Sequence, residues 1–192
     1  KNNITRWDGR KGFYEVYYTK LNHRKSGCGF WSRYTLLTPL PGKGEGKAEL
    51  WAIFFDPAEP EKNLALKETF PMEKSSIEKD RLSFRIGNSE ITHGRLRGGI
   101  EKEGKQIQWD LYFAPAKETF FHFPYPFMYR APLPKTKVLS PNFNVRINGF
   151  LKVGGRVFEC RGEPGQQTHL WGTKHAERWA WGHCNAFEED PE

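Results

Sequence analysis

The chain has 192 residues, enough to bury a hydrophobic core without a metal ion or a disulfide to hold it together. Its net charge is +7, but the 30 Lys and Arg are interspersed with 23 Asp and Glu, so nucleic acid is not expected as a partner. Three widely spaced cysteines, Cys28, Cys160 and Cys184, fit neither a disulfide framework nor a zinc or redox motif.

Short aromatic and apolar runs, separated by Gly, Pro and charged turns, predict an antiparallel β-structure in the first half of the chain. Residues 13–18 and 30–38 predict an opening hairpin. A turn segment at 39–47 leads into a mostly apolar run at 48–55, which predicts a buried strand. Further strands are predicted at 64–70, 81–86, 89–96 and 106–113.

The second half begins with an aromatic loop at residues 120–130, where alternating prolines remove the donors that a central strand needs. The loop could serve as a lid over a barrel mouth or as a plug in it. A hairpin is predicted from 144–151 and 156–160, followed by a Gly-rich linker and one helical turn at 173–178. The predicted fold is one all-β domain over residues 1–192, a lipocalin-like antiparallel β-barrel or closed double sheet with at most one short helix.

The last predicted strand, at residues 179–187, alternates strictly between large and small side chains. One face would carry Trp179, Trp181, His183, Asn185 and Phe187, and the other only small residues and a cysteine. Three aromatic rings around an imidazole and an amide are typical of a pocket wall.

Three segments resemble one known family. Trp171-Gly172 and the stretch 179–187 resemble the W-G and W-x-W-x-Q-C-N-x-F segments of the tocopherol cyclase family, which is related to carotenoid hydratase (hydroxyneurosporene synthase) and AttH-type proteins. The hairpin at 148–159 and the aromatic stretch at 126–140 also resemble that family. The resemblance is clear over about residues 120–188 and only general before them. One departure is His183, which stands where the family pattern has Gln.

The resemblance implies a calycin-like β-barrel, often the first of two such domains. Relatives of this kind act on prenylated or polyene lipids by proton-driven cyclisation, hydration or isomerisation. It therefore implies a second β-domain C-terminal to this chain. The chain starts at Lys1 without an initiator methionine and ends directly after a predicted strand, so we expect more protein on either side.

Proton-driven chemistry needs an acid beside aromatic rings that stabilise a carbocation, and His183 between Trp181 and Asn185 has that setting. The alternative is that His183 and Asn185 satisfy each other in a packed interior. His169, His175 and His183 match no zinc spacing, and Cys184 would point to the opposite face, so no metal is expected.

Two charged residues lie within apolar strands. Arg33 shares a face with Trp31, and Glu49 shares one with Trp51. Inside the barrel, Glu49 would have the raised pKa of a proton donor; on the outer surface, the more usual place for charges, both would meet water.

The sequence thus predicts a domain that binds a hydrophobic small molecule, with prenyl or polyene compounds as candidates. An isomerase, cyclase or hydratase step could use His183 or Glu49 as the acid and would need no redox cofactor. The candidate ligand-binding residues are Trp171, Trp179, Trp181, Asn185, Phe187, Arg33, Trp51, His169 and His175. The alternative is a non-catalytic structural or interaction domain with a filled aromatic core. A cytoplasmic or membrane-peripheral location is favoured, and contact with anionic lipid is kept as a hypothesis.

Overall fold

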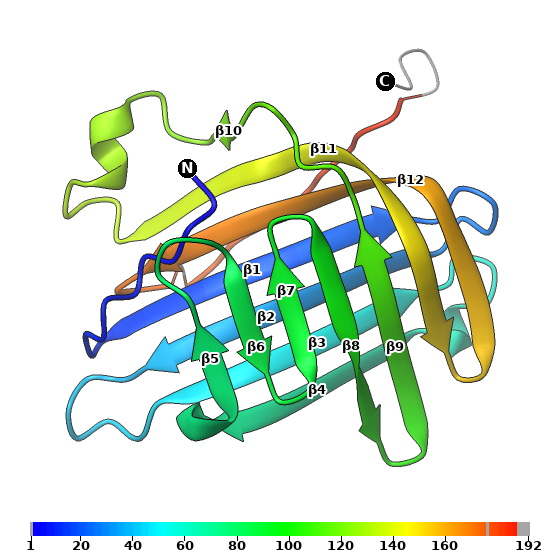
Figure 1. Ribbon diagram of the computed structural model, residues 1–192, viewed down its shortest axis with the longest axis horizontal. Coiled ribbons are helices and arrows are strands. Elements are labelled where there is room, and N and C mark those ends of the chain that lie inside the picture. Colours follow the sequence, from blue (N-terminus) through cyan, green and yellow to red (C-terminus); the bar gives the residue numbers. More distant parts are fainter. Residues whose placement is uncertain (1, 176, 188–192) are drawn as a thin grey trace.

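The structure is a computed structural model that describes residues 2–175 and 177–187 (Figure 1). Its described residues form twelve strands and three single turns of 3-10 helix, without an α-helix. Within the same ranges no helix has the length and apolar character needed to cross a bilayer. The predicted all-β class is therefore confirmed.

All twelve strands belong to one antiparallel sheet. In chain order they are β1 (Phe13–Asn22), β2 (Gly29–Thr38), β3 (Lys47–Phe55), β4 (Leu64–Pro71), β5 (Ser75–Ile77), β6 (Ser83–Ile86), β7 (Ser89–Thr92), β8 (Arg95–Lys102), β9 (Lys105–Tyr112), β10 (Phe120–Phe121), β11 (Thr136–Val153) and β12 (Arg156–Gly172). The 3-10 turns are η1 (Pro60–Lys62), η2 (Met72–Lys74) and η3 (Pro126–Tyr129).

The sheet curls on itself into two layers that form a nearly closed barrel (Figure 1). The strand order is β4-β3-β2-β1-β12-β11-β9-β8-β7-β6-β5, with the short β10 beside β11. Strands β1 to β4 make the back layer in Figure 1 and β5 to β9 make the front layer. The two edge strands, β4 and β5, are joined through η2 without a hydrogen-bonded ladder between them.

The hairpin of β11 and β12 links the layers because its two ends pair with different layers. The end of β12 pairs with β1, from Gly165 to Gly172, whereas the last part of β11, residues 148–153, pairs with β9. Three register shifts between β11 and β12 let the hairpin bend between these contacts. At Gly149 the bend brings the backbones so close that a Cβ would lie 2.0 Å from the carbonyl oxygen of Asp110.

Aromatic side chains from both layers fill the space between them. Tyr17 and Tyr34 of the back layer both contact Phe84 of the front layer, and the indole nitrogen of Trp109 donates to the Tyr34 hydroxyl at 3.3 Å. These side chains are almost completely buried, within one hydrophobic cluster that extends through both layers. The described interior is thus occupied by the protein's own side chains.

Two predicted elements of the chain differ from the structure in their extent. The run at 89–96 is split into β7 and β8 by a turn at His93 and Gly94, and β8 continues to Lys102. The Gly-rich linker predicted after Cys160 is wrong, because β12 continues to Gly172 and supplies the ladder with β1. The aromatic loop is confirmed, apart from the two residues of β10 and the single turn η3.

The predictions for the end of the chain are wrong as well. Residues 173–174 and 177–178 form bends rather than a helical turn, and residue 176 lies outside the described residues. Residues 179–187 belong to no strand, and Ala186 within them is in a bend with a φ of +63°. They have no edge to join, because β1, β11 and β12 each have neighbours on both sides and the free edges are β4 and β5.

Candidate functional site

The outer face of β1 is covered although it points away from the barrel interior. Alternation turns Tyr14, Val16 and Tyr18 outward, and all three are buried. Their cover is the C-terminal segment, the name used here for residues 173–175 and 177–187. Its His175 ring lies 5.5 Å from the Tyr14 ring, and its Trp181 ring meets Tyr18 edge-on at 5.8 Å. The segment therefore lies along the back layer instead of extending the sheet.

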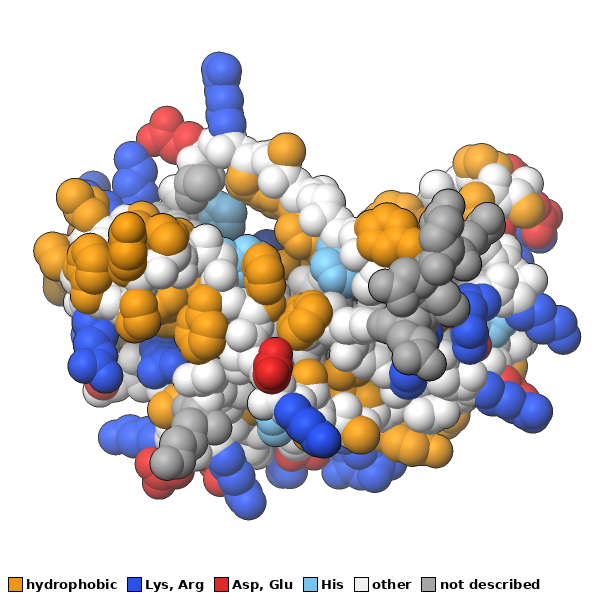
Figure 2. All heavy atoms as spheres, turned by 90° about the horizontal axis from the view of Figure 1, so that it is seen from above, with side chains coloured by type: hydrophobic (Ala, Val, Ile, Leu, Met, Phe, Trp, Pro, Cys, Tyr) orange, Lys and Arg blue, Asp and Glu red, His pale blue; other side chains and the backbone are white. Residues whose placement is uncertain are grey.

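Between this segment and the sheet lies a groove of about 910 Å³, which we call the outer groove. Strands supply Val16, Tyr18, Lys20, Trp31, Arg33, Ile53 and Phe55; the C-terminal segment supplies His175, Trp179, Trp181 and His183; the aromatic loop supplies His122. Seen from above, this side of the molecule is hollowed, and histidine side chains lie in the hollow (Figure 2). The volume falls within the range of about 300 to 1,000 Å³ typical of small-molecule sites.

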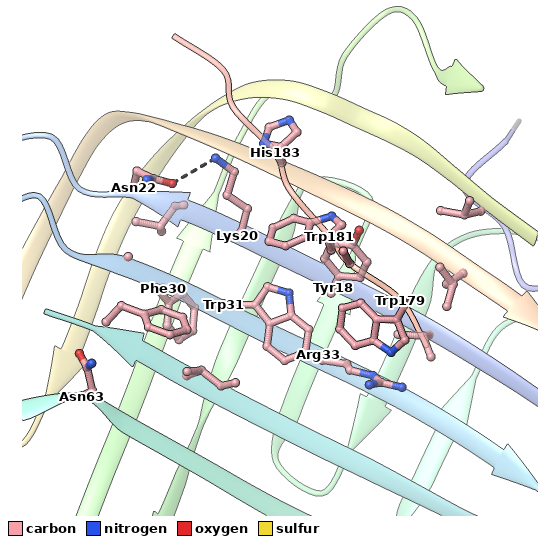
Figure 3. Close-up of a pocket in the computed structure, with 18 of the residues that line it drawn as sticks. Tyr18, Lys20, Asn22, Phe30, Trp31, Arg33, Asn63, Trp179, Trp181 and His183 are labelled. Carbon is pink, nitrogen blue, oxygen red and sulfur yellow. Dashed lines mark hydrogen bonds between the residues drawn. The ribbon is translucent and has the colours of Figure 1, made fainter. Parts of the chain in front are cut away.

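Aromatic rings form the middle of the outer groove (Figure 3). Tyr18 lies 6.0 Å from Trp31 on the neighbouring strand and 5.8 Å from Trp181 above it. Trp179 and Trp181 are nevertheless 66% and 47% exposed. Large apolar side chains that are left this open beside a hollow are typical of a surface that binds something.

A buried lysine lies at one end of the outer groove. The Lys20 ammonium donates to Asn22 Oδ1 at 3.1 Å and to Asn185 Oδ1 at 2.9 Å. Its side chain is 7% exposed, and burial lowers its pKa. No carboxylate of the described residues forms an ion pair with it. Asn185 is held in place by donating to Asn144 Oδ1 and to the Gly165 carbonyl.

His183 lies beside Lys20 (Figure 3). Its Nε2 donates to the carbonyl of Phe143 at 3.1 Å, so Nδ1 is the acceptor nitrogen, and Nδ1 is buried with no hydrogen-bond partner among the described residues. Burial and the nearby Lys20 charge lower the pKa of His183, and the bond to Phe143 offsets only part of this effect. Its neutral form is thus favoured.

Arg33 lies on the other side of the aromatic rings (Figure 3). Its Nε donates to Thr35 Oγ1 at 2.9 Å, while its two terminal nitrogens have no hydrogen-bond or ion-pair partner among residues 2–175 and 177–187. Burial lowers the pKa of Arg33, and the Glu49 charge offsets part of the effect. The guanidinium is therefore a half-buried cation with donors to spare.

Glu49 lies on the same outer face as Arg33 and is paired with two lysines. Its carboxylate lies 3.2 Å from Lys47 Nζ and 2.9 Å from Lys67 Nζ. Burial alone would raise the pKa of Glu49, but the hydrogen bonds from these lysines outweigh burial and lower it. Both charges thus face outward, the second of the two alternatives open from sequence, and the interior position with a raised pKa is wrong for Glu49.

Two other candidate residues, His169 and Trp171, point into the barrel instead. His169 is fully buried, stacks on Tyr17 at 4.2 Å, and donates from Nε2 to Glu15 at 2.8 Å. Its ring also lies 4.6 Å from that of Trp171. The histidines at 169, 175 and 183 are thus on opposite sides of the sheet and do not meet.

The Glu15 carboxylate is the centre of this interior cluster. It accepts hydrogen bonds from the backbone N–H groups of Arg6 and Trp7, from the Tyr17 hydroxyl and from His169. Burial would raise the pKa of Glu15, but these donors outweigh it and hold the pKa below its usual range. Neutral His169 thus donates to ionised Glu15 in a site closed to solvent, while its buried Nδ1 has no hydrogen-bond partner among the described residues.

The remaining candidates, Trp51 and Phe187, are not among the residues that line the outer groove. Trp51 is the cross-strand neighbour of Arg33 on β3, and the Lys67 ammonium lies 4.6 Å above its ring. Phe187 is 55% exposed at the end of the described chain. Sequence reasoning missed Tyr18 and Lys20, although the alternation of β1 carries the signal: both share a face with Tyr14 and Val16.

Known proteins resemble this chain in sequence and in fold. No protein-family model matches the chain. An uncharacterized protein of Mycobacterium tuberculosis, matched in strains H37Rv and CDC 1551, is 25% identical over 187 residues, which are 97% of this chain and 54% of that protein. The chain therefore spans about half the length of the curated relatives that it matches.

Two crystal structures share the fold. A candidate AttH from Nitrosomonas europaea has a TM-score of 0.64 at 14% identity, over 85% of this chain and 53% of its own. Kievitone hydratase from Nectria haematococca has a TM-score of 0.51 at 12% identity, over 84% of this chain and 48% of its own. At these identities the likeness concerns the fold alone. The chain therefore has an AttH-like, lipocalin-like β-barrel fold.

Proposed function

We propose that this domain binds a hydrophobic small molecule in the outer groove, against the aromatic rings of β1, β2 and the C-terminal segment. The observation that carries the proposal is the groove itself, about 910 Å³ in volume, with Trp179 and Trp181 open beside it. Burial of apolar surface contributes about 25 cal/mol of favourable free energy per Å². A flat aromatic or polyene ligand would cover a large part of these rings.

The position of the ligand follows from the packing of the barrel. Tyr17, Tyr34 and Trp109 pack with aliphatic side chains in one cluster inside the barrel, which supports the alternative prediction of an aromatic core. The outer groove supports the first prediction, that of ligand binding. The two predictions are compatible if the barrel serves as a scaffold and the ligand binds on its outer face.

Binding is better supported than acid catalysis by the two candidate acids. The lowered pKa of His183 favours its neutral form, which accepts a proton more readily than it donates one. The pKa of Glu49 is also lowered, so its carboxyl group is ionised near neutral pH. The comparison with kievitone hydratase supports a common scaffold and leaves this chain's own ligand and reaction to experiment.

The test uses the methyl ester of cis-parinaric acid, a neutral polyene that fluoresces when it leaves water. Titration into the purified chain should give saturable fluorescence. Trp181→Ala should weaken binding about 5- to 30-fold, the equivalent of about 1 to 2 kcal/mol of lost aromatic contact. Tyr112→Ala is the matched control, because Tyr112 is equally exposed but lies on β9 in the front layer. Absence of saturable binding, or equal loss in both variants, would refute the proposal.

We also propose that the chain is one β-domain of a longer protein, with a second β-domain following it. The support is the length of the M. tuberculosis relatives, of which the match covers 54%. If so, the exposed aromatic loop at 120–130 should gain protection from hydrogen exchange in the full-length protein relative to the isolated chain. Equal exchange in both would count against a partner domain at that loop.

A further inference from the structure

Among the described residues that line the outer groove, the acidic Asp56 is paired with Arg156 at 2.9 Å, whereas the cations Arg33 and Lys20 have no carboxylate partner. We propose that the groove takes an apolar molecule carrying one carboxylate, and that the Arg33 guanidinium binds this carboxylate. The inference rests on the proposed function, because it concerns the same groove. It adds the chemical class of the ligand and the residue that recognises it.

The Arg33 guanidinium has hydrogen-bonding capacity that the described residues do not use. Its Nε is engaged with Thr35, but its terminal nitrogens have no partner among the described residues. The nearest candidate counterion on this face, Glu49, forms its ion pairs with Lys47 and Lys67 instead. A planar guanidinium with a free fork of N–H groups matches the two oxygens of a carboxylate.

A second donor without a partner lies next to Arg33. Trp51 is the residue directly across the β2–β3 ladder, on the same outer face. Its indole N–H is buried and has no hydrogen-bond partner among the described residues. A buried donor left unpaired costs about 1 to 3 kcal/mol. A ligand oxygen at Arg33 would bring an acceptor to donors that no described residue engages.

Lys20 is the other cation of the groove and is less suited to be the anchor. Two oxygens, Asn22 Oδ1 and Asn185 Oδ1, already accept from its ammonium group, and the side chain is 7% exposed. Arg33 is more open and lies beside Trp179, on the opposite side of the ring cluster from Lys20 (Figure 3). The apolar body of the ligand would then lie across Trp31 and Tyr18, with its carboxylate at the Arg33 side.

The experiment compares cis-parinaric acid with its methyl ester, which share one polyene chain and differ in charge. At pH 8, and at concentrations below aggregation, the acid should bind wild type about 10- to 100-fold more tightly than the ester, the range expected for a charge-assisted hydrogen bond. Arg33→Gln should remove this preference, so that the variant binds the acid and the ester with equal affinity. The control Arg85→Gln removes an exposed front-layer charge and should change neither affinity.

Each outcome decides between the two claims. Equal binding of acid and ester by wild type would overturn the carboxylate inference and leave hydrophobic binding standing, and this comparison needs no variant to fold. Loss of the preference in Arg85→Gln as well would indicate general attraction by the net charge and would also overturn it. Binding of neither compound would overturn the proposed function itself.

Discussion

At the scale of single residues, the face of the sheet separates charges that look alike in the sequence. Glu15 and Glu49 both lie within apolar strands, yet Glu15 points into the barrel and Glu49 points out. Glu15 is satisfied by four donors from three parts of the chain, whereas Glu49 is satisfied by two lysines, one on its own strand and one on the neighbouring strand β4. Strand alternation identifies which residues share a face, but which face is inside depends on partners far away in the sequence.

The buried His169 should make stability depend on pH in a defined window. Burial lowers its pKa in the folded protein, while in the unfolded chain the pKa is about 6.5. The unfolded state therefore binds more protons below pH 6.5, and stability falls as the pH decreases from there toward the folded pKa. The lowered pKa of Glu15 acts in the same direction, in the lower range around the unfolded carboxyl pKa.

The variant His169→Gln isolates this effect, because a glutamine amide can still donate to Glu15 but does not titrate. We expect the free energy of unfolding, measured with urea between pH 5 and 7.5, to depend less steeply on pH in the variant. The slope below pH 6.5 should decrease by up to about 1.4 kcal/mol per pH unit. An unchanged slope would show that His169 is not held neutral by burial, since the other histidines are common to both proteins.

At the scale of elements, the alternation of side chains predicts which residues share a face of the sheet, but it does not predict which segments pair as strands. The stretch 179–187 alternates between large and small residues, but a strand also needs a free edge, and none adjoins it. The opposite error concerned β12, where Gln167, Thr168 and His169 are polar and yet fully buried. Hydrogen bonds such as those from Asn3 and Asn142 to Gln167 compensate this burial, and these partners are distant in sequence.

The bend of the β11–β12 hairpin depends on Gly149, whose φ of +117° only glycine adopts readily. A Cβ at this position would also lie 2.0 Å from the Asp110 carbonyl oxygen, within the ladder to β9. We expect Gly149→Ala to lower the free energy of unfolding by about 2 to 4 kcal/mol. The measurement is urea unfolding monitored by tryptophan fluorescence.

Gly154 provides the matched control for this prediction. It lies in the turn of the same hairpin with a φ of +52°, and a Cβ there would meet no atom within 4 Å. Gly154→Ala should therefore cost about 1 to 2 kcal/mol, for the backbone conformation alone. Equal losses in both variants would mean that the close approach to Asp110 does not hold the bend.

At the scale of the whole molecule, the sequence correctly predicted an all-β lipocalin-like barrel but not the side of the sheet on which its aromatic surface lies. Spacing of strands and turns is local information, and it sufficed for the class of fold. Whether Trp179 and Trp181 line the interior or the outer face of the barrel depends on the direction that the chain takes after β12. The C-terminal segment lies over the outer face, where His175 contacts Tyr14 and Trp181 contacts Tyr18. The groove thus forms between elements that are about 160 residues apart.

This arrangement predicts that folding and ligand binding can be separated by removing residues 173–192. The barrel strands end at Gly172, so the shortened chain should keep the far-ultraviolet circular dichroism of a β-protein. Uncovering part of Tyr14, Val16 and Tyr18 should lower the free energy of unfolding by roughly 2 to 4 kcal/mol. Binding of methyl cis-parinarate should be lost, because one wall of the outer groove is gone. A shortened, folded chain that still binds the ester with unchanged affinity would place the ligand inside the barrel, where β-barrels of this size hold one small molecule, and would refute the outer site.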